Sequence, residues 1–331
     1  MADVSASAAP VFCLRGPTAS GKTDLAVVLA ERAPVDVISV DSAMIYRGMD
    51  IGTAKPSVAL RQRVPHGLID ILDPAESYSA AAFRRDALRE IRRSHARGRI
   101  PLLVGGTMLY FRALEEGLSR LPSADPALRD RLEREAATRG VNGMHAWLRK
   151  LDPASAERLH VNDSQRVQRA LEVCLITGRP MSDLQAGGEG PPEGLALHRL
   201  AVMPAARSLL HQRIAERFHA MLEAGFEDEV SALRERGDLA LNQPSMRAVG
   251  YRQMWLHMDG AYGRQEMIKR AVTATRQYAK RQLTWLRRDD TVRVLTGPHA
   301  ALADDLQREI DRELVRWRPP TVTLAQADEP C

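Results

Sequence analysis

The N-terminal third of the chain alternates between short apolar runs and stretches in which apolar residues recur with helical spacing. Apolar runs at 11–16, 35–41 and 100–106 each predict a buried strand. Helical spacing is found at 23–34 and again at 79–98. Strand, helix, strand, helix and strand in this order are typical of an α/β domain with a parallel sheet.

The pattern changes from residue 119 onward. Between 119 and 185 the sequence predicts helices with clear start signals and no convincing strand. Asp125 and Asp152 each precede a proline, as an N-cap residue precedes the first helical position, and Asp163 opens a third helix. The stretch 186–194 is rich in Gly and Pro and predicts an irregular linker.

Strand and helix patterns return after this linker. Residues 197–204 predict a strand, a long helix follows that ends at Gly225, and 261–288 form the longest helical pattern. The helical stretch in the middle therefore reads as an insertion into one α/β core. We expect a first part of the core at 1–118, a helical insertion domain at 119–195, the rest of the core with basic C-terminal helices at 196–318, and a disordered tail at 319–331.

Composition narrows the class of protein. With 331 residues, 44% of them hydrophobic and 27% charged, the chain is an ordinary globular protein of about two domains. Cys13, Cys174 and Cys331 lie far apart, which argues against a disulfide framework and a four-ligand zinc site. We see neither a secretory signal nor an apolar run long enough to cross a membrane, so we expect a cytoplasmic protein.

The segment GPTASGKT at 16–23 matches the phosphate-binding pattern G-x-x-x-x-G-K-[ST] between a predicted strand and a predicted helix. Backbone N–H groups of such a loop surround an anion, Lys22 adds a positive charge, and the Thr23 hydroxyl is placed to bind Mg²⁺. We predict a di- or triphosphate ligand and a P-loop NTPase-like core whose parallel sheet is interrupted by an all-helical insertion domain. The candidate phosphate-binding residues are Gly16, Pro17, Thr18, Ala19, Ser20, Gly21, Lys22 and Thr23.

Two polar residues follow predicted strands and should face the same edge of the sheet. Ligands of open α/β sheets gather at the carboxyl ends of strands, where Asp41 and Thr107 lie. A carboxylate there can bind Mg²⁺ or accept a proton, although an Asp after a strand can also be a helix N-cap. Arg217, in the helix after residue 204, is either an anion ligand or a surface residue.

Positive charge is concentrated near the C-terminal end. The net charge of the chain is +5, but residues 244–288 carry ten Lys or Arg and two acidic residues, which leaves −3 for the rest. On a helix, Lys269, Arg276, Lys280 and Arg287 share one face. The opposite, apolar side is expected to hold Tyr278, Ala279, Leu283, Trp285 and Leu286. A face of one sign predicts a polyphosphate partner, most simply a nucleic acid, over a solvated surface.

Several segments taken together resemble one family, the tRNA dimethylallyltransferases. The order and number of the matching blocks make this resemblance far more specific than the phosphate-binding loop alone. The matching blocks are GPTASGKT at 16–23, DSAMIYRGMDIGTAKP at 41–56, GGTMLYFRAL at 105–114, NDSQRVQRALEV at 162–173, RFHAMLEAGFEDEV at 217–230, RAVGYRQMW at 247–255 and KRQLTWLR at 280–287.

The resemblance implies transfer of a dimethylallyl group from dimethylallyl diphosphate to the exocyclic amine of the adenine 3′ of the anticodon in tRNA. The P-loop would then hold the diphosphate of the donor, with Mg²⁺, and the adenine would be flipped out of its stack. The insertion would close over the anticodon stem-loop. The chain lacks the C-terminal zinc finger of eukaryotic members and so resembles the bacterial form, which we expect to act as a monomer.

The resemblance also implies roles for individual residues. Asp41 would be the general base, Thr107 would place the donor or the adenine, and Arg217 would bind the diphosphate. Met44 stands where many members have Gln and lacks the amide that could bond to the base. The implied tRNA-contacting residues are Asp41, Ser42, Ala43, Met44, Thr107, Arg129, Gln165, Arg166, Val167, Gln168, Arg169, Arg247, Ala248, Val249, Gly250, Tyr251, Arg252, Lys280, Arg281, Gln282, Leu283, Thr284, Trp285, Leu286 and Arg287.

Three other functions fit parts of the sequence. A P-loop kinase or ATPase with a small-molecule substrate accounts for the phosphate-binding loop alone. An adenylate isopentenyltransferase needs neither the insertion nor the basic segment at 244–288. An RNA-binding, ATPase-like switch would need no transfer chemistry. Label from dimethylallyl diphosphate that enters tRNA would separate the expected activity from all three.

Overall fold

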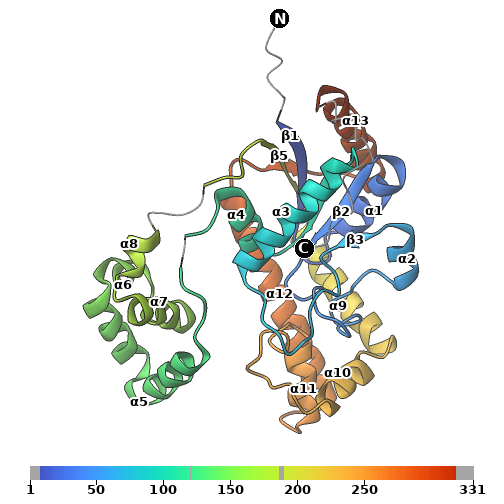
Figure 1. Cartoon of the computed structure of the whole chain (residues 1–331). Coiled ribbons are helices and arrows are strands. Elements are labelled where there is room, and N and C mark those ends of the chain that lie inside the picture. The colour runs from blue at the N-terminus through green and yellow to red at the C-terminus, as the bar shows by residue number, and fades with distance from the viewer. Residues whose placement is uncertain (1–7, 120, 186–189, 318–331) are drawn as a thin grey trace, which may run out of the picture. The chain divides into compact units, whose positions relative to one another are not determined.

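The computed structural model describes residues 8–119, 121–185 and 190–317, which fall into two compact units (Figure 1). Unit 1 comprises 1–114 and 193–331, and unit 2 comprises 115–192. Unit 2 thus starts and ends a few residues before the expected 119–195. At its end the reason is that Leu195 already pairs with Ala9 as the first residue of a strand. The tail expected at 319–331 lies outside the described residues.

Unit 1 is built on a six-stranded sheet in the order β3-β2-β4-β1-β5-β6, and all its strand pairs are parallel. The fold class predicted from the sequence is confirmed. The central strand β1 pairs with β4 on one side and with β5 on the other, so the phosphate-binding loop leaves the middle of the sheet. The strands are β1 (Ala9–Arg15), β2 (Val35–Val40), β3 (His66–Gly67), β4 (Ile100–Gly105), β5 (Leu195–Val202) and β6 (Arg293–Leu295).

Helices cover both faces of this sheet because alternate strand residues enter two different apolar clusters. Phe12 and Leu14 pack with residues of α1 (Lys22–Arg32) and α13 (His299–Trp317). Val11 and Cys13 point the other way and pack with residues of α3 (Ala80–Ala96) and α4 (Met108–Glu116). Because β1, β2 and β4 are buried on both faces, each of these three strands appears in the sequence as a nearly continuous apolar run. A short helix, α2 (Val58–Arg63), precedes β3.

Four further helices form a third apolar cluster beyond the carboxyl ends of the strands. They are α9 (Arg207–Glu223), α10 (Phe226–Glu235), α11 (Tyr251–Met258) and α12 (Arg264–Arg288). The prediction that Trp285 lies on the buried side of α12 is wrong, because its exposed fraction is 39%. At about 100° per residue, Trp285 falls outside the arc of Ala279, Leu283 and Leu286, which are buried.

The described part of unit 2 contains four helices joined by loops. They are α5 (Pro126–Leu151), α6 (Pro153–Arg158), α7 (Ser164–Thr177) and α8 (Met181–Gln185). The predicted caps are confirmed, since Asp125, Asp152 and Asp163 each accept a hydrogen bond from a backbone N–H of the helix that they precede. Asp152 is fully buried and also accepts from the backbone N–H and hydroxyl of Ser182. Among the described residues, no helix is both long and apolar enough to cross a membrane.

Candidate active site

The phosphate-binding loop runs from the end of β1 into α1. Gly21 has φ 83°, in the region that favours glycine, and a Cβ there would lie 2.0 Å from Cε1 of His299. Gln282 of α12 is buried against this loop. Its side-chain Oε1 accepts a 2.9 Å hydrogen bond from the Thr18 backbone N–H, and its Nε2 donates to the Gly106 carbonyl at 2.8 Å. The basic helix therefore holds the loop in place directly.

Lys22 points back across this loop, and its ammonium donates to the Pro17 carbonyl at 3.2 Å. Burial lowers the pKa of Lys22 to about 8, although the nearby Asp41 carboxylate acts against this; the Arg217 guanidinium lowers the pKa a little further. A lysine with such a pKa is ready to take up or keep a proton when an anion arrives. A bound anion would therefore favour the charged form of Lys22.

Asp41 lies directly after β2, as predicted, and lines the cavity above the loop. It is not a helix N-cap. Its Oδ1 accepts hydrogen bonds from the backbone N–H groups of Ala43 at 2.8 Å and Met44 at 3.3 Å, which closes a turn. The Thr107 hydroxyl accepts from the Ser42 N–H at 3.2 Å, so both predicted catalytic residues are held by one short segment. Asp41 Oδ2 has no hydrogen-bond partner among residues 8–119, 121–185 and 190–317.

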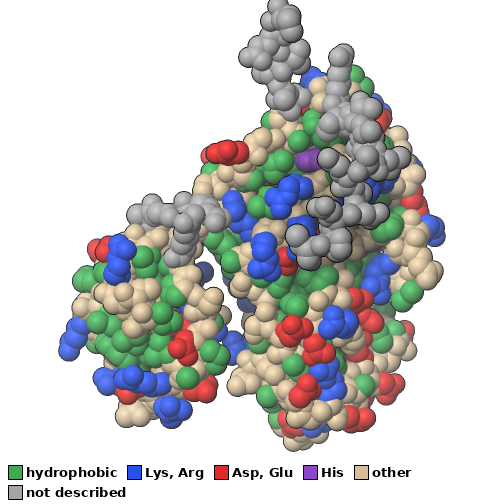
Figure 2. Space-filling view, in the orientation of Figure 1, with side chains coloured by type: hydrophobic (Ala, Val, Ile, Leu, Met, Phe, Trp, Pro, Cys, Tyr) green, Lys and Arg blue, Asp and Glu red, His purple; other side chains and the backbone are tan. Residues whose placement is uncertain are grey.

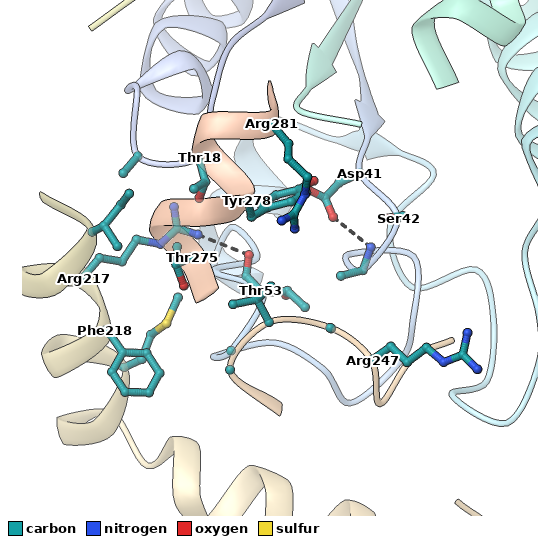
Figure 3. A pocket seen from close by; sticks show the side chains of 18 of the residues that line it. Thr18, Asp41, Ser42, Thr53, Arg217, Phe218, Arg247, Thr275, Tyr278 and Arg281 are labelled. Carbon is teal, nitrogen blue, oxygen red and sulfur yellow. Dashed lines mark hydrogen bonds between the residues drawn. The ribbon is translucent and has the colours of Figure 1, made fainter. Parts of the chain in front are cut away.

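Arg217 reaches the same site from α9. Its guanidinium donates to the Thr53 carbonyl at 3.3 Å, and burial lowers its pKa while Asp41 and Asp24 raise it. In Figure 3 the side chains of Asp41 and Tyr278 lie close together, whereas Arg217 points toward Thr53. Arg217 lines both cavities of the site, and its role as an anion ligand stays a prediction.

Two connected cavities meet at Asp41. One, of about 840 Å³, lies over the phosphate-binding loop and is lined by Lys22 and Thr23. The other, of about 340 Å³, has an apolar wall that includes Phe218 and Met221. Residues that line both cavities are Thr18, Ala19, Asp41, Thr53, Arg217 and Tyr278. The site can therefore hold a charged group and a small apolar group side by side, with a carboxylate between them.

Part of the predicted tRNA-contacting set is buried in this structure. These residues are Val167, Gly250, Tyr251, Gln282, Leu283 and Leu286, and two of them, Gly250 and Gln282, still line the cavities of the site. Periodicity explains this, since a helical segment shows only one face. The exposed or half-exposed remainder is Asp41, Ser42, Ala43, Met44, Thr107, Arg129, Gln165, Arg166, Gln168, Arg169, Arg247, Ala248, Val249, Arg252, Lys280, Arg281, Thr284, Trp285 and Arg287.

The cations of α12 differ from those of α3 in their pairing. Lys280, Arg281 and Arg287 are exposed and form no ion pair within the ranges 8–119, 121–185 and 190–317. Basic side chains also gather over α3 in Figure 2, but there Asp86 and Glu90 of the same helix pair with arginines. Of the predicted basic face of α12, Lys269, Lys280 and Arg287 are exposed, whereas Arg276 is half-buried and donates to the His211 carbonyl at 3.4 Å. By contrast, α3 is a solvated surface of mixed sign.

Unit 2 presents its own basic residues on α5 and α7. Glu172 is buried and accepts a bidentate pair of hydrogen bonds from Arg129, at 2.9 and 3.2 Å. Arg169 donates to the same carboxylate at 2.6 Å. Arg129 nevertheless remains about half exposed. Both arginines are therefore held in fixed positions by one buried acid and keep surface that a phosphate can reach.

Three residues of the site were missed by sequence reasoning. Tyr278 was placed on the apolar side of its helix, yet it lines both cavities, and its pKa is raised by burial and by Asp41. Thr53 contributes a backbone carbonyl, which leaves no trace in the sequence. His299 lines the phosphate cavity from the start of α13, and no pattern indicates it. Tyr278 lies outside the matching block 280–287, so the resemblance did not indicate it either.

Comparison with known proteins agrees with this geometry. The family model described as IPP transferase matches residues 44–289. A tRNA dimethylallyltransferase of Alkalilimnicola ehrlichii is 58% identical over 92% of this chain and 96% of its own length, and one of Chromobacterium violaceum is 55% identical over 96% and 97%.

Solved structures agree as well. The tRNA isopentenylpyrophosphate transferase of Bacillus halodurans superposes with a TM-score of 0.67 at 37% identity, covering 93% of this chain and 98% of that one. A eukaryotic dimethylallyltransferase acting on tRNA gives a TM-score of 0.75 at 26% identity, over 95% and 81%. The chain therefore belongs to the IPP transferase family, and its activity is that of a tRNA dimethylallyltransferase.

Proposed function

We propose that the two cavities carry out this reaction on dimethylallyl diphosphate and the adenine 3′ of the anticodon. The observation that supports this most is the position of Asp41 where the phosphate cavity meets the apolar one. The diphosphate lies over the P-loop and the dimethylallyl group extends past Asp41 toward Phe218 and Met221. The amine nitrogen of the adenine attacks C1 of the dimethylallyl group, and the C1–O bond breaks as diphosphate leaves with the electron pair.

The phosphate-binding residues serve the leaving group. Backbone N–H groups of the loop, Lys22 and Arg217 stabilise the charge that develops on the departing diphosphate. The cavity also suits Mg²⁺, because the Thr23 hydroxyl lines it, and a hydroxyl oxygen together with substrate phosphate oxygens is what Mg²⁺ prefers. When bound, Mg²⁺ would supply further neutralisation of the diphosphate charge.

Asp41 and Thr107 serve the acceptor. Asp41 Oδ1 is used by the turn at Ala43 and Met44, which leaves Oδ2 to accept the proton from the adenine amine. Thr107 adjoins it through the Ser42 N–H and helps to place the base. Since a stacked base cannot enter the cavity, the adenine reaches Asp41 only after it is flipped out of the RNA.

The exposed cations serve the RNA backbone. On unit 1 these are Arg247 and Arg252, with Lys280, Arg281 and Arg287 on α12. Arg247 points away from Asp41 in Figure 3, which suits a contact with the anticodon stem-loop rather than with the donor. On unit 2, Arg129, Arg166 and Arg169 bind the same stem-loop. We propose that the protein acts as a monomer in the cytoplasm.

Incubation of the protein with labelled dimethylallyl diphosphate, tRNA and Mg²⁺ tests this function. We expect label in tRNA, at the adenine next to the anticodon, and stoichiometric release of diphosphate. Label on free adenosine phosphates instead would indicate an adenylate isopentenyltransferase. ATP hydrolysis without transfer to tRNA would contradict the proposal altogether.

The basic face of α12 predicts a specific salt dependence. Replacing Lys280 and Arg287 together by Ala should lower the slope of log K against log salt for tRNA binding by about 1 to 2, because each phosphate contact releases roughly one counterion. Binding titrations between low and moderate salt measure the slope. As a matched control, Arg85 and Arg93 of α3, which pair with acidic neighbours, should be replaceable without effect. An unchanged slope for the α12 variant would remove this helix from the interface.

A further inference from the structure

The carboxylate of Glu229 in α10 accepts four hydrogen bonds next to the smaller cavity of the site. Its Oε2 accepts from the backbone N–H groups of Asp50 at 2.8 Å and Ile51 at 2.7 Å. Its Oε1 accepts from the Gly52 N–H at 3.0 Å and from the Tyr251 hydroxyl at 2.5 Å. One carboxylate thus holds three successive backbone groups of one loop and the first residue of α11.

Both segments that Glu229 joins line the smaller cavity, of about 340 Å³. Gly52 and Thr53 form one wall, and the segment 247–250 before Tyr251 forms another. The two walls touch closely: a Cβ on Gly52 would lie 2.6 Å from the Tyr251 ring. The Thr53 carbonyl in turn accepts the hydrogen bond from Arg217. A continuous chain of contacts therefore leads from Glu229 to the guanidinium that faces the diphosphate.

The loop is also held at a second place, independently of Glu229. The buried ammonium of Lys55 donates to Asp50 Oδ1 at 2.5 Å, to Asp70 Oδ1 at 2.6 Å and to the Tyr46 carbonyl at 2.8 Å. Because Lys55 fixes the end of the loop against the body of unit 1, loss of the Glu229 contacts should move residues 50–53 without unfolding the protein. Glu229 thus determines where the cavity wall lies more than whether the loop forms.

We propose that Glu229 is a positioning residue of the transfer reaction, which sets the Thr53 carbonyl for Arg217 and aligns the segment 247–252 with the same cavity. The proposal rests on the function proposed above. Glu229 contacts neither donor nor acceptor, and it acts through backbone groups that do. A carboxylate is needed because only an anion with two free oxygens accepts four donors at once, whereas a glutamine amide nitrogen would face N–H groups.

The variant Glu229→Gln tests this role. We expect pyrophosphate to bind about tenfold more weakly and the KM for dimethylallyl diphosphate to rise by a similar factor, while kcat stays within about threefold. Removing the partner of two backbone N–H groups should disturb Thr53 and therefore Arg217. Calorimetric titration with pyrophosphate measures binding without turnover, and steady-state kinetics give KM and kcat separately. A merely structural role would lower the melting temperature and leave pyrophosphate affinity of the folded enzyme unchanged.

Two further variants keep the test decisive. Glu235 lies on the same helix, and its carboxylate accepts a hydrogen bond from the Ser231 hydroxyl. The variant Glu235→Gln should therefore bind pyrophosphate as tightly as the unmodified protein does. Tyr251→Phe removes one of the four donors and should weaken pyrophosphate binding in the same direction by less; it carries the test if Glu229→Gln does not fold. Unchanged affinity in both Glu229→Gln and Tyr251→Phe, or an equal loss in Glu235→Gln, overturns the role of Glu229. Failure of the proposed function would show separately, as missing transfer by the unmodified protein.

Discussion

Replacing Asp41 by Asn should lower the rate of transfer to tRNA by a factor of about 10² to 10⁴, the usual contribution of a general base. The asparagine carbonyl can still accept from the Ala43 and Met44 N–H groups, so the turn is kept and only the proton acceptor is lost. Single-turnover transfer from labelled dimethylallyl diphosphate measures the rate. Affinity for tRNA should change by less than about threefold.

The comparison of Asn with Ala at this position separates chemistry from structure. Asp41→Ala also removes the acceptor of the two loop N–H groups and should therefore lose tRNA affinity as well as rate. Pyrophosphate should bind Asp41→Asn at least as tightly as it binds the unmodified protein, because an anion has been removed from its cavity. A variant Asp41→Asn that transfers at the normal rate would assign the proton to another acceptor.

Replacing Lys22 by Met should weaken pyrophosphate binding by a factor of about 10 to 10², the value of one hydrogen bond to a charged group, and should slow transfer by more. The larger effect on rate follows because the charge on the diphosphate grows as the C–O bond breaks. Calorimetric titration and single-turnover transfer give the two numbers. Lys150→Met, which removes the same charge from an exposed position of α5 in unit 2, should change neither.

The lowered pKa of Lys22 adds a pH dependence with a definite sign. In the free protein Lys22 loses its proton near pH 8, whereas a bound diphosphate favours the charged form. Binding above this pH therefore requires uptake of a proton, and pyrophosphate affinity should fall by about five- to sixfold between pH 8 and pH 9. The ratio of affinities of the unmodified protein and Lys22→Met cancels the titration of pyrophosphate itself. A ratio that is constant with pH would show that Lys22 is charged throughout.

Most of the sheet was predictable because its strands are buried on both faces. Continuous apolar runs mark β1, β2 and β4, and the glycine-rich loop after β1 fixes the direction of the chain. The strand β6 was not predictable, since it has three residues and two of them, Arg293 and Val294, are exposed. Its position depends on pairing with β5, which no local pattern encodes.

The candidate site was predictable where local sequence determines it and not where distant residues meet. The phosphate-binding loop with Lys22 was predicted from its motif, and the place of Asp41 was predicted from its position directly after a strand. The bond between Thr18 and Gln282 joins residues 264 positions apart, and the bond between Asp50 and Glu229 joins residues 179 positions apart. A helical projection separates apolar from charged faces, and for this reason it assigned Tyr278 to the core. It cannot show that the apolar face of α12 borders a cavity at that point.

The place of β1 in the sheet has a consequence for synthesis of the chain on the ribosome. β1 pairs with β5 over seven residues, yet all of unit 2 is made between β4 and β5. At about 5–20 residues per second, one edge of the central strand stays unpaired for several seconds, while β2 and β4 are already available. An open strand edge favours pairing with other chains. If the helices of unit 2 pack rapidly into their own core, they do not compete with β5 for the open edge of β1. The speed of translation through unit 2 would then influence the yield of folded protein.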